Sequence, residues 1–126
     1  MSSILSSLFS RNRVKISCIG EHDAVGERIC YGIEDKIGML LLDFGRRVPS
    51  APGHELGSHL REDSSNVPLE DCPDFKKLEG KFIYGVALSH GHLDHIGAMK
   101  RLLEEHRGTR IITSKFTKQV VERKIL

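Results

Sequence analysis

The sequence has few of the features that mark a membrane, secreted or strongly charged protein. Its longest apolar run, Met39–Leu42, is far too short to cross a bilayer. Cysteine is scarce: Cys18, Cys30 and Cys72 form no CxxC pair, which argues against a disulfide framework and fits a reducing cytosol. Lys and Arg number 19 against 17 acidic residues, so bulk charge does not indicate a nucleic-acid partner and only a local patch would do so. We therefore expect a soluble, cytoplasmic protein without a membrane partner.

The length and composition that remain are those of one globular domain. The chain has 126 residues, of which 39% are hydrophobic and 29% are charged. Residues 1–13 are rich in Ser and end in Arg, and we expect them to form an N-terminal tail. Residues 14–126 are then expected to form the domain.

Three short apolar segments predict strands in the first part of the domain. Val14–Ile19 alternates apolar and polar residues, which is typical of a strand with one buried face. Arg28–Ile33 and Ile37–Asp43 flank a polar turn at Glu34–Lys36, which predicts an antiparallel hairpin. Because the second arm is apolar on both faces, we expect it to be an interior strand covered on two sides.

The second part of the chain predicts a long excursion followed by a β-α-β-α unit. Residues 46–80 hold all four prolines and an acidic cluster, and we expect a long surface excursion beside a site. Phe82–Leu88 has the pattern of a buried strand, Ile96–His106 that of an amphipathic helix, and Arg110–Thr113 that of a short strand. Ser114 is expected to cap a last helix. The fold class is therefore α/β of the α+β type.

One motif, His90-x-His92-x-Asp94-His95, directly follows the predicted buried strand. Residues two apart on a strand point to the same face, so His90 and His92 are expected to converge. Asp94 and His95 then fall at the start of the next helix. Imidazoles and a carboxylate form a ligand set suited to Zn²⁺, Fe or Mn²⁺, and the carboxyl end of an interior strand is where α/β sheets form their sites. The motif therefore predicts a metal site.

Two segments carry a resemblance to a known family. Ser89–Met99 (SHGHLDHIGAM) resembles the HxHxDH metal motif of the metallo-β-lactamase superfamily, and Leu40–Gly45 (LLLDFG) resembles the strand-ending Asp-x-Gly element that precedes this motif. Within the superfamily, the DHIGA continuation is most similar to the β-CASP nucleases and ribonuclease J. The resemblance extends over roughly Val14 to Thr113 and implies the N-terminal half of an αββα sandwich.

The resemblance implies a role for each matching residue. His90 and His92 match ligands of a first metal, and Asp94 and His95 match ligands of a second. Asp94 also matches the catalytic residue that orients the attacking water, and Asp43 matches a carboxylate that supports the site from behind the ligands. The family implies two Zn²⁺ ions, with Mn²⁺ or Fe as alternatives. Its nucleases hydrolyse RNA with a metal-bound hydroxide.

The sequence departs from the family pattern downstream of the motif. The family has further His and Asp ligands there, but no His follows His106 and no Asp follows Asp94 in this sequence. We therefore expect a truncated chain that binds metal weakly and is inactive alone, with an uncovered sheet face that favours self-association. Of the other histidines, His22 is the best candidate ligand because it follows a strand. The spacing of the other three, His54, His59 and His106, favours no ligand role.

Two alternatives to a ribonuclease stay open on the sequence alone. A small-molecule ester, thioester or lactone hydrolase has the same fold without the β-CASP domain. A non-catalytic metal-binding or scaffold module would keep the motif and lose the reaction. Residues 100–126 carry eight Lys and Arg against three Glu, which fits an RNA-facing patch, although a solvated helix face is the more common reason for such a pattern.

Overall fold

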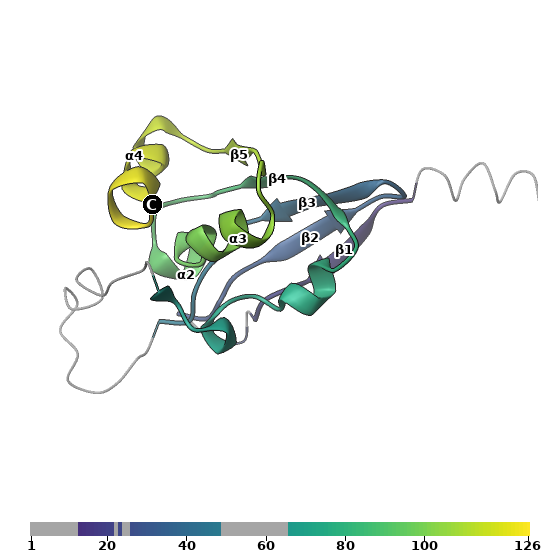
Figure 1. Ribbon diagram of the computed structural model, residues 1–126, viewed down its shortest axis with the longest axis horizontal. Coiled ribbons are helices and arrows are strands. Elements are labelled where there is room, and N and C mark those ends of the chain that lie inside the picture. Colours follow the sequence, from purple (N-terminus) through teal and green to yellow (C-terminus); the bar gives the residue numbers. More distant parts are fainter. Residues whose placement is uncertain (1–12, 22, 24–25, 49–65) are drawn as a thin grey trace, which may run out of the picture.

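A five-stranded sheet organises the part of the chain that the structure describes. The computed structural model describes residues 13–21, 23, 26–48 and 66–126. The strands lie in the order β1-β2-β3-β4-β5 across the sheet (Figure 1). Their bounds are β1 Lys15–Cys18, β2 Tyr31–Glu34, β3 Gly38–Leu42, β4 Phe82–Ala87 and β5 Ile111–Ile112. The predicted tail, except for Arg13, lies outside the described residues, as does the stretch 49–65 of the predicted excursion.

The strand directions confirm the mixed α/β class and the predicted order of elements. Strands β1, β2 and β3 pair antiparallel, and β4 pairs parallel with both β3 and β5. The strand expected to begin at Arg28 begins only at Tyr31. The reason is that the Ile29 amide donates to the Asp94 carbonyl, at 3.0 Å, and so leaves the ladder. This departure draws the start of β2 toward the histidine motif.

The helix expected at Ile96–His106 is two helices, α2 (Leu93–Ile96) and α3 (Met99–Glu105). The break falls at Ala98, whose amide donates to the Phe44 carbonyl at 3.1 Å instead of continuing the α2 ladder. The last helix, α4 (Lys115–Lys124), begins as predicted, because the Ser114 hydroxyl accepts from the Thr117 amide at 3.2 Å. Among the described residues, no helix is long and apolar enough to cross a membrane.

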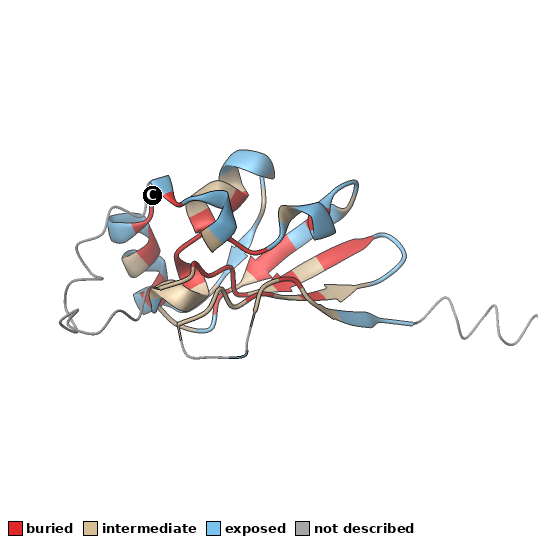
Figure 2. Cartoon of the chain, turned by 90° about the horizontal axis from the view of Figure 1, so that it is seen from below, coloured by how far each residue is buried: buried red, intermediate tan, exposed pale blue. Residues whose placement is uncertain are grey.

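The described part of the predicted excursion packs against the sheet. Residues 66–80 form two short 3₁₀ helices, η3 (Leu69–Asp71) and η4 (Phe75–Leu78), on the same side of the sheet as α2 and α3 (Figure 2). Val67, Cys72 and Leu78 are all at least 98% buried beneath them. This part of the expected surface excursion therefore contributes to the core, because its apolar side chains lie beneath an otherwise polar segment.

The two faces of the sheet differ in what covers them. On one face, Met39, Leu41 and Val86 are fully buried against side chains of α2 and α3. On the other face the described residues provide no helix (Figure 2), and Phe82 is 61% and Ile112 60% exposed. Strand β3 is an interior strand of the sheet as expected, but on its second face Leu40 and Leu42 are only partly buried. The expected exposed apolar face is confirmed at Phe82 and Ile112. Self-association through this face stays a prediction.

Candidate metal centre

The four motif residues converge where β4 ends and α2 begins. His92 directly precedes α2, and Asp94 and His95 lie in the single turn of this helix. The ring centroid of His90 lies 4.6 Å from that of His92 and 4.0 Å from that of His95. The Nε2 atom of His95 lies 3.5 Å from Oδ2 of Asp94. The expected convergence is observed, with His92 exposed and the other three side chains half-buried.

Asp43 anchors this cluster from the end of β3. Its side chain accepts hydrogen bonds from the Ser89 amide at 2.7 Å, the Ser89 hydroxyl at 2.9 Å and Nδ1 of His95 at 2.8 Å. Asp43 is only 7% exposed, and its φ of 61° lies in the left-handed region. Such a backbone costs on the order of 1–3 kcal/mol, so the surrounding contacts must hold it in place. The predicted position of Asp43 beside the histidines is confirmed.

The hydrogen bonds of Asp43 and Ser89 select the tautomers of two histidines. A carboxylate carries no proton, so the single proton of the Ser89 hydroxyl goes to Asp43. The Ser89 oxygen then accepts from Nδ1 of His90, 2.9 Å away, while Nδ1 of His95 donates directly to Asp43. When the rings are neutral, this arrangement leaves Nε2 of both without a proton, which is the form that binds a metal. Sequence reasoning missed the role of Ser89, and its only signal is that it immediately precedes the motif.

The local electrostatics favour an uncharged ring at His90 and a bound cation between Asp94 and His95. Burial, and then the neighbouring His95 and His92, lower the pKa of His90, which favours its neutral form. Nε2 of His95 and Oδ2 of Asp94 are both acceptors, so at 3.5 Å they repel unless a proton or metal ion lies between them. Two ligands of one tetrahedral metal, each about 2.1 Å from it, lie roughly 3.4 Å apart. The spacing and the donor chemistry of this pair therefore fit a shared ion.

The backbone of Phe44 and Gly45, directly after Asp43, holds the motif in place and is called the strap here. The Phe44 amide donates to the His95 carbonyl at 2.8 Å, and the Gly45 amide donates to the Ile29 carbonyl at 3.0 Å. A Cβ on Gly45 would lie 1.5 Å from the Asp94 carbonyl oxygen, so no side chain fits there. The glycine of the Asp-Phe-Gly sequence is thus required by the close approach of the strap to α2.

An ionic cluster joins the segments around the strap. Arg47 lies 3.1 Å from a carboxylate oxygen of Glu21 and 3.2 Å from one of Glu27, and Arg28 also pairs with Glu21 at 2.5 Å. All four side chains are partly exposed, and exposed ion pairs typically contribute less than about 1 kcal/mol each. Their effect is therefore mainly to hold the loop after β1 against the strap.

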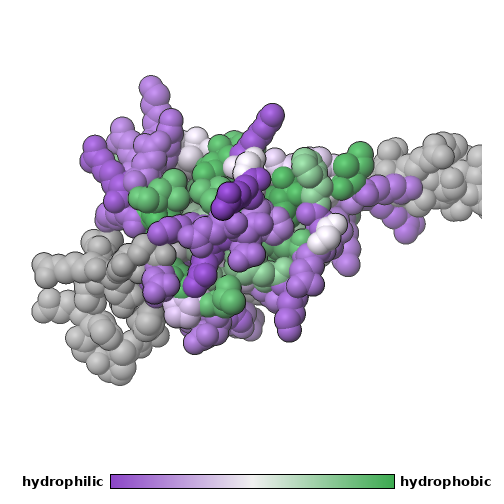
Figure 3. Space-filling view, viewed as in Figure 1, coloured by the Kyte–Doolittle hydropathy of each residue, from purple (hydrophilic) through white to green (hydrophobic). Residues whose placement is uncertain are grey.

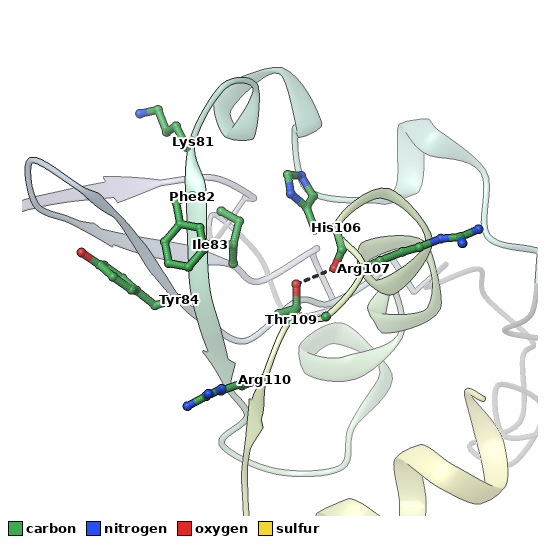
Figure 4. Close-up of a pocket in the computed structure, with 9 residues that line it drawn as sticks. Lys81, Phe82, Ile83, Tyr84, His106, Arg107, Thr109 and Arg110 are labelled. Atoms are coloured by element: carbon green, nitrogen blue, oxygen red, sulfur yellow. Dashed lines mark hydrogen bonds between the residues drawn. The ribbon is translucent and has the colours of Figure 1, made fainter.

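The described residues do not form a complete metal site by themselves. Within them, no group of three or more His, Cys, Asp or Glu side chains is placed so as to hold an ion. His106, a weaker candidate ligand, lines a separate pocket of about 570 Å³ between the start of β4 and the loop after α3 (Figure 4). Ser89 lies at the other end of β4, so His106 is not part of the cluster. The remaining candidates lie outside the described residues; they are His22, His54 and His59.

Comparison with known proteins relates the chain to ribonuclease J. It is 29% identical to a ribonuclease J of Pyrococcus abyssi over 115 residues and 31% identical to one of Methanocaldococcus jannaschii over 121 residues. Each match covers 90% of this chain and therefore includes the segment from Asp43 to His95. The chain spans only about a quarter of the length of these curated relatives. No family model matches the sequence.

Proposed function

We propose that this chain carries part of the active site of a metal-dependent RNA hydrolase similar to ribonuclease J. The observation that carries the proposal is the hydrogen-bond network of Asp43 and Ser89, which holds Nδ1 of His90 and of His95 and so, in neutral rings, leaves Nε2 available to a metal. The relatives, named as ribonucleases, support RNA as the substrate class. The metallo-β-lactamase motif gives the proposed ligands.

In this proposal each motif residue has a defined task. His90 and His92 hold one divalent ion, and Asp94 and His95 hold a second, with Zn²⁺ as the proposed metal and Mn²⁺ or Fe as alternatives. Such ions lower the pKa of water and stabilise negative charge on the phosphate under attack. Asp94 would also accept a hydrogen bond from the attacking water and so orient it, while Asp43 fixes the ring orientation of His95.

The incomplete set of metal ligands also fits a second candidate function. Because no group of three donors is placed to hold an ion among the described residues, a non-catalytic metal-binding module would have the same local structure. A small-molecule hydrolase would also use the same cluster, but the names of the relatives favour RNA. Metal binding and hydrolysis therefore have to be tested separately.

The metal-binding part is tested on the 126-residue chain itself. Zn²⁺ is titrated while the histidine side-chain nitrogens are followed by ¹⁵N NMR. We expect the Nε2 signals of His90 and His95 to shift, and we expect His90→Ala to weaken Zn²⁺ binding at least tenfold. His106→Ala, at the other end of β4, is the matched control and should bind as the wild type does. Equal affinity in all three proteins would contradict the proposed site.

The hydrolytic part is tested in a chimera. Residues 14–113 replace the matching quarter of the Methanocaldococcus jannaschii ribonuclease J, and cleavage of single-stranded RNA is measured beside cleavage of a p-nitrophenyl ester. We expect metal-dependent RNA cleavage by the chimera that is lost on Asp94→Asn, and no turnover by the 126-residue chain alone. Ester cleavage without RNA cleavage would favour the small-molecule hydrolase, and an inert chimera that binds metal would favour the non-catalytic module.

A further inference from the structure

Helix α4 lies directly beside the histidine cluster. Gly91 separates His90 from His92, and a Cβ placed on Gly91 would lie 3.3 to 3.4 Å from the side-chain carbons of Val120 on α4. These distances are shorter than most real Cβ contacts, so the backbone at Gly91 lies close against the middle of α4. Any substrate that reaches the motif from this side must pass over α4.

The helix divides into a buried face and an exposed face. Thr117, Val121 and Ile125 are buried beneath it. Phe116 lies one turn before Val120 and is 74% exposed, a large apolar ring on the outer face of a helix that buries only Thr117 and Val121 within its own bounds. Residues 123 and 124 lie one turn after Val120, so their side chains fall near the same edge of the helix.

The exposed face of α4 is strongly basic. Between residues 115 and 124 the helix carries four cationic side chains and the single acid Glu122; the cations are Lys115, Lys118, Arg123 and Lys124. Only Lys118 pairs with Glu122, at 3.9 Å, and in the described part of the chain the other three form no ion pair. Hydrophilic side chains accordingly gather over α4 in Figure 3. This excess of positive charge is local, since the whole chain has a net charge of only +2.

We propose that α4 is a binding surface for single-stranded RNA, in which Phe116 stacks on a base and Arg123 and Lys124 contact phosphates. The inference rests on the proposed function and adds how the substrate approaches the site. An exposed aromatic ring among unpaired cations is the combination by which proteins bind single strands with little sequence preference. A protein partner would also cover Phe116, but three cations of the same helix that form no ion pair in the described part of the chain favour a polyanion.

The test measures binding without hydrolysis. A fluorescein-labelled single-stranded oligouridine is titrated with the 126-residue chain in EDTA, and binding is followed by fluorescence anisotropy. Phe116→Ala should weaken binding about 5- to 150-fold, as expected for the loss of one base-stacking contact, and Phe116→Tyr should retain most of the affinity. Phe82→Ala is the matched control, because this ring is 61% exposed at the other end of β4, and it should leave RNA binding unchanged.

The cationic contribution has its own readout. Arg123→Gln should reduce the slope of log affinity against log salt concentration by about 0.7, the value for one phosphate contact on a single strand. Lys76→Gln, an exposed cation on η4, should leave the slope unchanged. An unchanged slope in Arg123→Gln would overturn the phosphate contact.

The outcomes separate this surface from the proposed function. Three results would each overturn the proposed RNA-binding surface. They are wild-type affinity in Phe116→Ala, an equal loss of affinity in Phe82→Ala, and no RNA binding by the wild type at low salt. Self-association that Phe116→Ala abolishes, without RNA binding, would assign the helix to a protein contact and would also overturn it. Because the assay contains no metal, RNA binding is measured separately from hydrolysis. RNA binding through Phe116 in a chimera that does not cleave RNA would support the surface while contradicting the hydrolase.

Discussion

Strand β3 has an aspartate just before it and another just after it, and the two form different kinds of network. Asp35, before the strand, is exposed and accepts from the backbone amides of Ile37 and Gly38 and from the Tyr84 hydroxyl. Asp43, after the strand, is buried and accepts from the amide and hydroxyl of Ser89 and from a histidine ring. Both carboxylates thus bind backbone amides and a hydroxyl group, in opposite surroundings.

The difference lies in where the partners of each aspartate come from. The two amide partners of Asp35 are two and three residues away, so Asp35 organises its own turn, and only its third partner, the exposed Tyr84 hydroxyl, is distant in sequence. The partners of Asp43 are 46 and 52 residues away, so Asp43 joins segments that meet only in the folded protein. The mainly local network of Asp35 shapes a turn at the surface, whereas the buried network of Asp43 positions chemical groups, and we expect its loss to lower the free energy of unfolding more.

The largest expected effect comes from removing each carboxylate in turn. Asp43→Ala should lower the free energy of unfolding by about 2–3 kcal/mol, because it leaves the partially buried donors of Ser89 and His95 without their charged acceptor. Asp35→Ala is the matched control and should cost less, because water replaces the lost partners. Urea denaturation of both variants measures the difference. A loss in Asp35→Ala as large as that in Asp43→Ala would remove the distinction between the two ends.

A smaller effect is expected when one hydroxyl group is removed at either end. Ser89→Ala frees Nδ1 of His90 from its acceptor, so the ring no longer has one preferred tautomer. We expect Zn²⁺ affinity to fall about 10- to 100-fold, the usual effect of losing a group that orients a ligand. Tyr84→Phe removes the hydroxyl that Asp35 binds and should leave Zn²⁺ affinity unchanged. Isothermal titration of both variants decides whether the hydroxyl of Ser89 acts on the metal centre.

The smallest effect is a pH dependence at the exposed end. Hydrogen bonds from the amides of Gly38 and Ile37, and then from Tyr84, lower the pKa of Asp35 in the folded chain. A carboxylate with a lowered folded pKa adds stability above its unfolded pKa, near 4, and this stability is lost as the pH falls through the folded pKa. Asp35→Asn should therefore be less stable than the wild type at pH 6, and the difference should shrink toward pH 3. A difference that is constant with pH would show that the charge of Asp35 is not what stabilises the turn.

Local signals predicted much of this structure. The alternation in residues 14–19, the polar turn before β3 and the Ser114 cap each act within a few residues, and each appears where it was expected. The motif was likewise predicted to converge at the end of β4, because residues two apart on a strand share a face. Asp43 was placed beside it through the family resemblance.

The features that sequence reasoning missed depend on distant partners. The α2–α3 break occurs because the Ala98 amide bonds to Phe44, more than 50 residues earlier. The late start of β2 has the same kind of cause, since Ile29 bonds to Asp94. The irregular pairing of β3 and β4 after Met39 leaves no sign in the local pattern of residues. The tautomer-setting role of Ser89 was missed because it depends on Asp43, which is 46 residues away in the sequence.

The strap after β3 has a consequence for when the centre forms. The Phe44 amide and carbonyl are both bonded, to His95 and Ala98, so the strap is bound on both sides by residues around α2. Closing the long connection between Phe44 and His95 costs chain entropy before any contact compensates for it. Contacts between residues far apart in the sequence also form slowly. During synthesis, β4 and α2 must therefore be translated and must dock before Asp43 meets its partners. We therefore expect the centre to form late in folding, and a ribosome-bound chain that ends before His95 contains Asp43 without the site that it supports.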